Sequence, residues 1–67
     1  MSIQFIVDGR NGRDERVILW RIGEYTYELE IGTGIHKRSV KLANTEYYDA
    51  LAAFDAAVEN YQDLEAV

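Results

Sequence analysis

The sequence contains no cysteine and no proline among its 67 residues. Without cysteine, no disulfide framework and no thiolate metal site can stabilise the fold, so packing has to stabilise it alone. No stretch approaches the roughly 18 to 20 consecutive apolar residues of a membrane span, and no basic segment followed by an apolar run opens the chain. We therefore predict one small cytoplasmic domain, residues 1–67, with no membrane contact and with 48% apolar residues available for a core.

Groups that could perform catalysis are also scarce. His36 is the only histidine; it lies beside Lys37 and Arg38, and no serine or cysteine is placed to form a nucleophilic set with it. The acidic residues around position 11 lack the spacing and the terminal glutamate of a calcium-binding loop. We predict a protein that is not an enzyme and uses no cofactor and no metal.

Basic residues are missing from the C-terminal part of the chain. All seven Lys and Arg lie between Arg10 and Lys41, whereas residues 42–67 carry six acidic residues and no basic one. A net charge of −5 disfavours a general attraction to nucleic acid or to anionic lipid and leaves open a partner with a basic surface. This division of charge is the strongest functional signal in the sequence.

Alternating apolar and polar residues predict four strands in the first part of the chain. The first strand covers residues 3–7, and a flexible loop, residues 8–15, follows it. The dipeptide Gly23-Glu24 has the glycine-first pattern of a two-residue hairpin turn between strands 16–22 and 25–31. These segments predict an antiparallel meander.

The hairpin turn sets the predicted register of the central strands. Pairing Ile22 with Tyr25 places Trp20 opposite Tyr27 on the core face and leaves Leu19 on the opposite, open face. A fourth strand, residues 35–42, then pairs with the third so that Glu30 lies opposite Lys37 as a cross-strand ion pair, and Val40 and Leu42 join the core face.

Helical periodicity replaces the alternation from Thr45 to Leu64. Asn44 or Thr45 can cap this helix, and acidic residues in its first turn favour the positive end of the helix dipole. One apolar stripe runs along it: Tyr47, Ala50, Leu51, Phe54, Ala57, Val58, Tyr61 and Leu64. We predict an α+β fold, a four-stranded antiparallel β-meander with one C-terminal amphipathic helix packed on one face.

The outer face of this helix is the first candidate site. It carries acidic residues over small alanines and has no Lys or Arg as an i,i+4 partner, so it suits a Lys/Arg-rich surface of another protein. A solvated helix face explains the same acids equally simply. The predicted partner-binding residues are Tyr48, Asp49, Asp55, Glu59 and Asp63.

The segment KLANTEYYDALAAFDAAVENY, residues 41–61, is a strand end that leads into an acidic helix rich in tyrosine and alanine. In this segment, and in length, acidity and absence of cysteine, the chain resembles small phage-encoded inhibitors of bacterial defence, notably the anti-CRISPR proteins. The segment is about a third of the chain, and these families share no general motif, so the resemblance assigns no residue a role. It implies a non-enzymatic blocker that docks on a CRISPR effector, on its basic nucleic-acid-binding surface, in the host cytoplasm.

Two alternatives use other surfaces. A small nucleic-acid-binding regulator would use the basic residues of loop and sheet, although the net charge makes direct nucleic-acid binding the weaker hypothesis. Its predicted contacts are Arg10, Arg13, Arg16, Arg21, Lys37, Arg38 and Lys41. A homodimer or second interface would use the apolar residues predicted on the open face of the sheet, Ile6, Val17 and Leu19.

Overall fold

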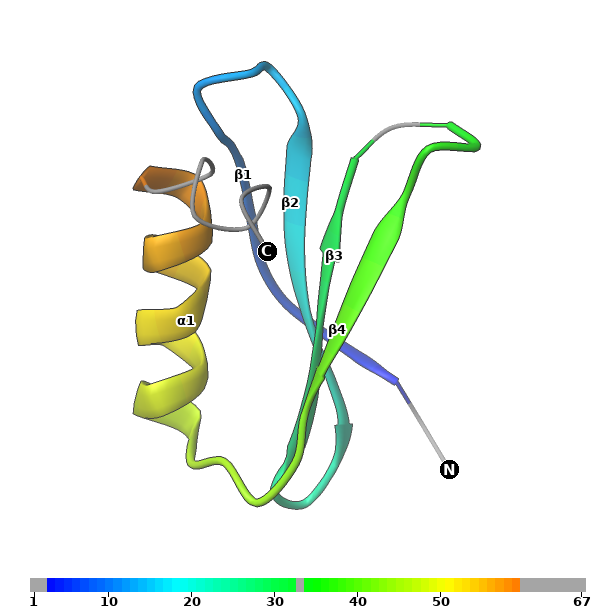
Figure 1. The fold of residues 1–67 in the computed structure, drawn as a ribbon. Coiled ribbons are helices and arrows are strands. Elements are labelled where there is room, and N and C mark those ends of the chain that lie inside the picture. Colours follow the sequence, from blue (N-terminus) through cyan, green and yellow to red (C-terminus); the bar gives the residue numbers. More distant parts are fainter. Residues whose placement is uncertain (1–2, 33, 60–67) are drawn as a thin grey trace.

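The structure is a computed structural model, and it describes residues 3–32 and 34–59. Four strands form one antiparallel sheet in the order β1-β2-β3-β4, and a single helix covers one of its two faces (Figure 1). The predicted small α+β fold is confirmed. The elements are β1 (Gln4–Arg10), β2 (Arg16–Gly23), β3 (Thr26–Ile31), β4 (Arg38–Leu42) and α1 (Tyr47–Glu59).

The register between β2 and β3 differs by one residue from the predicted one. Leu19 lies opposite Leu29 and Trp20 lies opposite Glu28, where the prediction had paired Trp20 with Tyr27. The turn is formed by Glu24 and Tyr25, and the register shifts at the end of β2, so that Gly23 pairs with Thr26. Because side chains alternate between the faces of a strand, this one-residue slip exchanges the two faces of β2.

The face exchange overturns the predicted open-face patch. Val17 and Leu19 are 0% exposed and belong to the core beneath the helix, while Ile6 is partly buried and packs against that core. Trp20, predicted in the core, lies on the open face. The core consists of Val17, Leu19, Tyr27, Leu29, Ile31, Ala50, Phe54 and Ala57.

Strand β4 is shorter than predicted, and its pairing with β3 is shifted by two residues. Glu30 is opposite Ser39, not Lys37, so the predicted cross-strand ion pair does not follow from the register. A two-residue shift preserves the faces, and Leu42 still packs against the core as predicted. The longer β3–β4 connection contains Gly32 with a φ of 122°, where a Cβ atom would stand 2.4 Å from the carbonyl oxygen of His36. Only glycine fits there.

Helix α1 begins at Tyr47 and buries Ala50, Phe54 and Ala57 against the sheet. Its predicted apolar stripe is confirmed for these residues and for the partly buried Leu51 and Val58. Tyr47, also predicted in the stripe, is 44% exposed, because it lies in the first turn at the end of the sheet. Tyr61, Asp63 and Leu64 lie outside the described residues.

The entry to α1 is held by the β2–β3 turn. The backbone N–H of Thr45 donates to the carbonyl oxygen of Tyr25 at 2.9 Å. The Thr45 hydroxyl donates back to the carbonyl oxygen of Ala43 at 3.0 Å, which differs from the predicted capping of the helix. At the other end, Gly9 on β1 lets the Phe54 ring approach closely, since an added Cβ would lie 3.2 Å from its Cζ atom. These two anchors fix the helix over β1 and β2.

Candidate interaction surfaces

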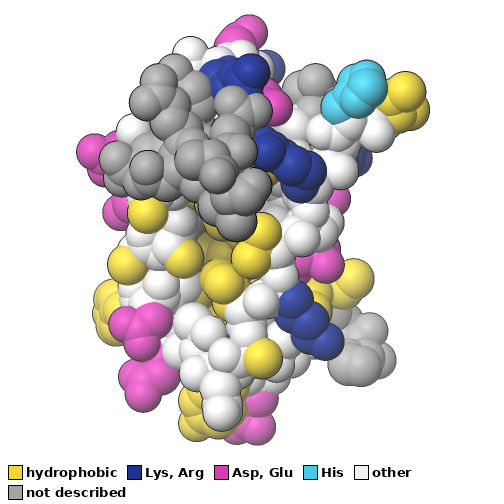
Figure 2. Space-filling model, in the orientation of Figure 1, with side chains coloured by type: hydrophobic (Ala, Val, Ile, Leu, Met, Phe, Trp, Pro, Cys, Tyr) yellow, Lys and Arg dark blue, Asp and Glu magenta, His cyan; other side chains and the backbone are white. Residues whose placement is uncertain are grey.

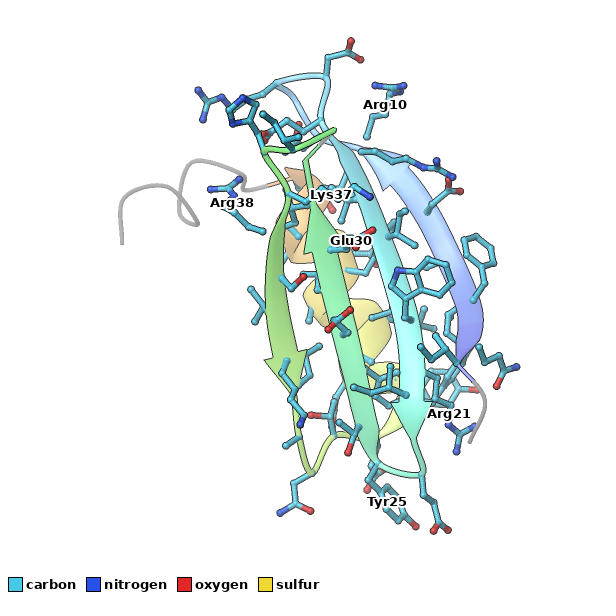
Figure 3. The ribbon with its side chains drawn as sticks, turned by 90° about the vertical axis from the view of Figure 1, so that its right-hand side faces the viewer. Arg10, Arg21, Tyr25, Glu30, Lys37 and Arg38 are labelled. Carbon is cyan, nitrogen blue, oxygen red and sulfur yellow. The ribbon has the colours of Figure 1, made fainter. Side chains whose placement is uncertain are left out.

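Two faces of the molecule can meet a partner, and they lie on opposite sides of the sheet. The acidic helix face is the outward surface of α1, with Tyr48, Asp49, Asp55 and Glu59. The open sheet face is the side of the sheet that the helix leaves uncovered, and Figure 3 views the molecule from that side.

The acidic helix face combines exposed carboxylates with exposed small residues. Asp49, Asp55 and Glu59 are all exposed, and so are Ala52 and Ala56 beside them. The last described turn of the helix carries no basic residue. In Figure 2, acidic side chains lie along the helix side of the view and Lys and Arg lie towards the strands. The helix therefore presents negative charge on a surface that another backbone can approach closely.

Tyr48 is the most exposed aromatic side chain of this surface, at 81%. At 100° per residue, positions 48, 55 and 59 fall on one stripe of a helix, so Tyr48, Asp55 and Glu59 face the same way, and Asp49 flanks them. The Tyr48 ring meets the Tyr47 ring edge-on, with centroids 5.4 Å apart and planes at 76°. Four of the five predicted partner-binding residues thus share one side of the helix, and Asp63 lies outside the described residues.

The arginines of the basic set are largely engaged within the chain. Arg16 binds the carboxylate of Asp8 at 2.8 Å, and Arg10 binds that of Asp14 at 3.1 Å. Arg38 lies 3.6 Å from the carboxylate of Glu15. Nucleic acid would therefore have to compete with the chain's own carboxylates for these guanidinium groups.

The seven basic residues also do not form one surface. Arg10, Lys37 and Arg38 lie towards one end of the sheet, and Arg21 lies at the other end (Figure 3). Arg21 donates to the carbonyl oxygens of Gly23 at 3.2 Å and Glu24 at 3.0 Å. It therefore holds the β2–β3 turn. Arg13, Lys37 and Lys41 are exposed.

The β1–β2 loop is an ordered structure centred on Asn11, which is only 7% exposed. Its Oδ1 atom accepts from the backbone N–H groups of Arg13 and Glu15, both at 3.0 Å. Its Nδ2 atom donates to the Glu15 carboxylate at 3.0 Å. The flexible loop predicted over residues 8–15 is thus a five-residue turn closed by one buried amide, and two of its N–H groups point inward to that amide.

The open sheet face carries apolar residues that the sequence prediction had placed elsewhere. Phe5 is 50% exposed and meets the partly buried Trp20 edge-on, with ring centroids 5.8 Å apart and planes at 78°. Ile3, 67% exposed, lines two shallow depressions beside these rings, one with Trp20, Glu28 and Glu30 and one with Ile22 and residues of β3 and β4. The β2–β3 register places Trp20 on this face, and an irregularity in β1 between Phe5 and Val7 places Phe5 there.

Charges on the open sheet face are mixed. The strand pairings place three acidic and three basic side chains on this side of the sheet: Asp8, Glu28, Glu30, Arg10, Arg16 and Lys41. Asp8 and Arg16 form the ion pair described above, and Glu28 lies directly opposite Lys41 on the neighbouring strand. The face is therefore close to neutral, unlike the helix side.

Within residues 3–32 and 34–59, no group of three or more His, Cys, Asp or Glu side chains is placed to hold a metal ion. No helix in the same part of the chain is long and apolar enough to cross a membrane. His36 lies in the exposed β3–β4 connection.

Comparison of the chain with protein-family models, with curated proteins and with solved structures gives no match.

Proposed function

We propose that this chain is a non-catalytic protein that inhibits another protein by binding it, with the acidic helix face docked on a basic surface. The observation that carries the proposal is the distribution of its charges. Carboxylates on the helix are exposed and, within the described ranges, take part in no ion pair, whereas three arginines elsewhere are paired with acids of the chain itself. The charge left for a partner is negative.

Electrostatic complementarity of this kind acts mainly on association rate and on partner choice. Asp55 and Glu59 lie one helical turn apart, and Asp49 flanks them, so a basic groove can meet several carboxylates at once. Exposed ion pairs contribute only about 0–1 kcal/mol each, so affinity also needs buried contacts. Tyr48 supplies a large side chain of the type that dominates interface hot spots.

The most specific form of the proposal is a blocker of a bacterial defence effector. Two features support it: the resemblance to small phage-encoded inhibitors, and a face that offers carboxylates to a surface that otherwise holds nucleic-acid phosphate. Nucleic-acid binding by the basic residues stays the alternative. It predicts binding of a fluorescent single-stranded oligonucleotide that weakens steeply with rising salt, which the helix-docking proposal does not.

The test is affinity capture with the tagged chain from a bacterial lysate that contains defence systems, read by mass spectrometry at low and moderate salt. Recovery of a nucleic-acid-handling effector is expected, and Glu59→Lys and Asp55→Lys should each weaken its capture several-fold. Glu30→Lys is the matched control, since it makes the same change in net charge on the open sheet face, on the other side of the sheet from α1 (Figure 3). Equal losses for Glu30→Lys and Glu59→Lys would reduce the effect to overall charge and remove the helix face from the proposal.

A further inference from the structure

The open sheet face exposes more apolar surface than is usual for the solvent-facing side of a sheet. In a two-layer domain the helix covers one side of the sheet, and the other side normally alternates to polar residues. Here β1 and β2 present Phe5, Ile18 and Trp20 on the uncovered side, with Ile3 beside them. Ile18 is 9% exposed without belonging to the core cluster under the helix, so side chains on this side of the sheet already cover it.

We propose that the open sheet face is a homodimer interface, in which the Phe5–Trp20 cluster of one copy packs against the same cluster of a second copy. A two-fold interface uses one surface patch twice, so the patch has to be complementary to itself. An apolar centre is complementary to a copy of itself, because apolar surface packs on apolar surface. Glu28, Glu30 and the Asp8–Arg16 ion pair border the cluster and would form a polar rim.

The distribution of charge favours a second copy over a basic partner at this face. The chain carries a net charge of −5, so two copies repel unless the surfaces that meet are near neutral. The open sheet face has three acidic and three basic side chains, and α1, with its exposed acids, lies on the other side of the sheet (Figure 1). Two copies can therefore meet here with their excess negative charge held apart.

The area of the open sheet face limits the affinity that a dimer can reach. Four strands about 4.8 Å apart and about 20 Å long cover roughly 400 Å² of flat area per copy. With side-chain relief, two copies would bury on the order of 1,000 Å² in total, at the lower limit for a specific interface. The dimer is then expected to form in the micromolar range, as a four-layer arrangement with sheets packed about 10 Å apart and both helices outside.

Trp20 gives a direct probe, because it is the only tryptophan in the chain. Analytical ultracentrifugation across the micromolar range should show the 7.7 kDa monomer at the lowest concentrations and twice that mass at the highest. Over the same range, quenching of Trp20 emission by acrylamide should fall as the second copy covers the ring. Both signals should follow one dissociation constant.

The matched variants are Phe5→Glu and Ile35→Glu. Both replace an exposed apolar side chain with a charge, but Phe5 lies on the open sheet face and Ile35, 93% exposed, lies in the β3–β4 connection. Phe5→Glu should raise the dissociation constant at least tenfold, and Ile35→Glu should leave it unchanged. Circular dichroism of each variant establishes that the fold persists, and Ile3→Glu replaces Phe5→Glu if the latter unfolds.

Three outcomes overturn the inference. A chain that stays monomeric through the whole micromolar range has no such interface. A dimer with unchanged Trp20 quenching, or one that Ile35→Glu disrupts as strongly as Phe5→Glu, forms through another surface. A monomer whose Trp20 becomes protected only when a captured protein is added assigns the face to that protein. The first two results leave capture through the helix untouched, so this inference can fail while the proposed function stands. The third also places the captured protein on the open sheet face, and Glu59→Lys then shows whether the helix takes part in its capture.

Discussion

The register of β2 decides which residues are core and which are surface, and two alanine substitutions test it. Leu19 is 0% exposed and belongs to the core, while its neighbour Trp20 lies partly buried on the open sheet face. Leu19→Ala should cost about 2–5 kcal/mol, the usual range for truncating a buried leucine. Trp20→Ala should cost roughly 1–2 kcal/mol, since much of its ring contact is with surface neighbours and solvent.

These values are large against the whole stability of the domain. The free energy of unfolding expected for a chain of 67 residues is about 3–10 kcal/mol. Leu19→Ala therefore removes much of this stability, whereas Trp20→Ala leaves most of it. Urea unfolding followed by circular dichroism, at concentrations too low for dimers, measures both. If Trp20→Ala proves the more damaging change, Trp20 faces the helix, and the assignment of the open sheet face is wrong.

Two further predictions concern the connections between strands. Asn11→Ala should destabilise the fold by about 1–3 kcal/mol in urea unfolding, because it leaves two loop N–H groups without their acceptor. In a Glu15→Gln background, where no second carboxylate faces the site, Asn11→Asp keeps the acceptor oxygen and should cost less than Asn11→Ala, and equal costs would contradict this account. Gly32→Ala should lower the thermal midpoint clearly more than Gly34→Ala, because both glycines have positive φ but only at Gly32 would the new Cβ meet backbone, 2.4 Å away. Equal shifts in differential scanning calorimetry would mean that the connection relaxes around Gly32.

The order and type of the elements could be predicted because each has a strong local signal. Ala50, Phe54 and Ala57 follow helical spacing within a longer apolar stripe, and the structure buries all three. Alternation and glycine positions located the four strands. The boundaries were less certain, and β4 begins at Arg38, three residues later than predicted.

The register could not be predicted because it depends on one residue at a turn. The sequence Gly23-Glu24 suits a two-residue hairpin, yet the turn forms one position later, at Glu24 and Tyr25, with an irregularity in β2 before it. Arg21 binds two carbonyl oxygens of that turn, and Thr45 binds a third from the helix entry. The Thr45 contact comes from a segment distant in sequence, so a local pattern could not reveal it.

The candidate sites also differ in whether a local sequence pattern could predict them. Exposure of Tyr48, Asp49, Asp55 and Glu59 followed from helical spacing alone, and their role as a binding surface stays a prediction. The apolar patch on the open sheet face depended on the β2–β3 register and on the irregularity in β1, so its predicted members Ile6, Val17 and Leu19 were wrong and Phe5 and Trp20 were missed. Asn11 could have been noticed, since asparagine commonly closes turns by accepting from the backbone two residues on.

The two surfaces have a joint consequence because the sheet separates them. A dimer formed through the open sheet face leaves both helices on the outside, each with its acidic face free, so dimerisation and partner binding should not compete. A second acidic helix on the same particle strengthens binding only where the partner presents two basic sites within reach, since bivalent binding fails when geometry forbids simultaneous contact. Phe5→Glu should therefore weaken capture of a partner with paired or repeated basic surfaces and leave capture of a monovalent one unchanged. Glu59→Lys should weaken both while the dimer persists.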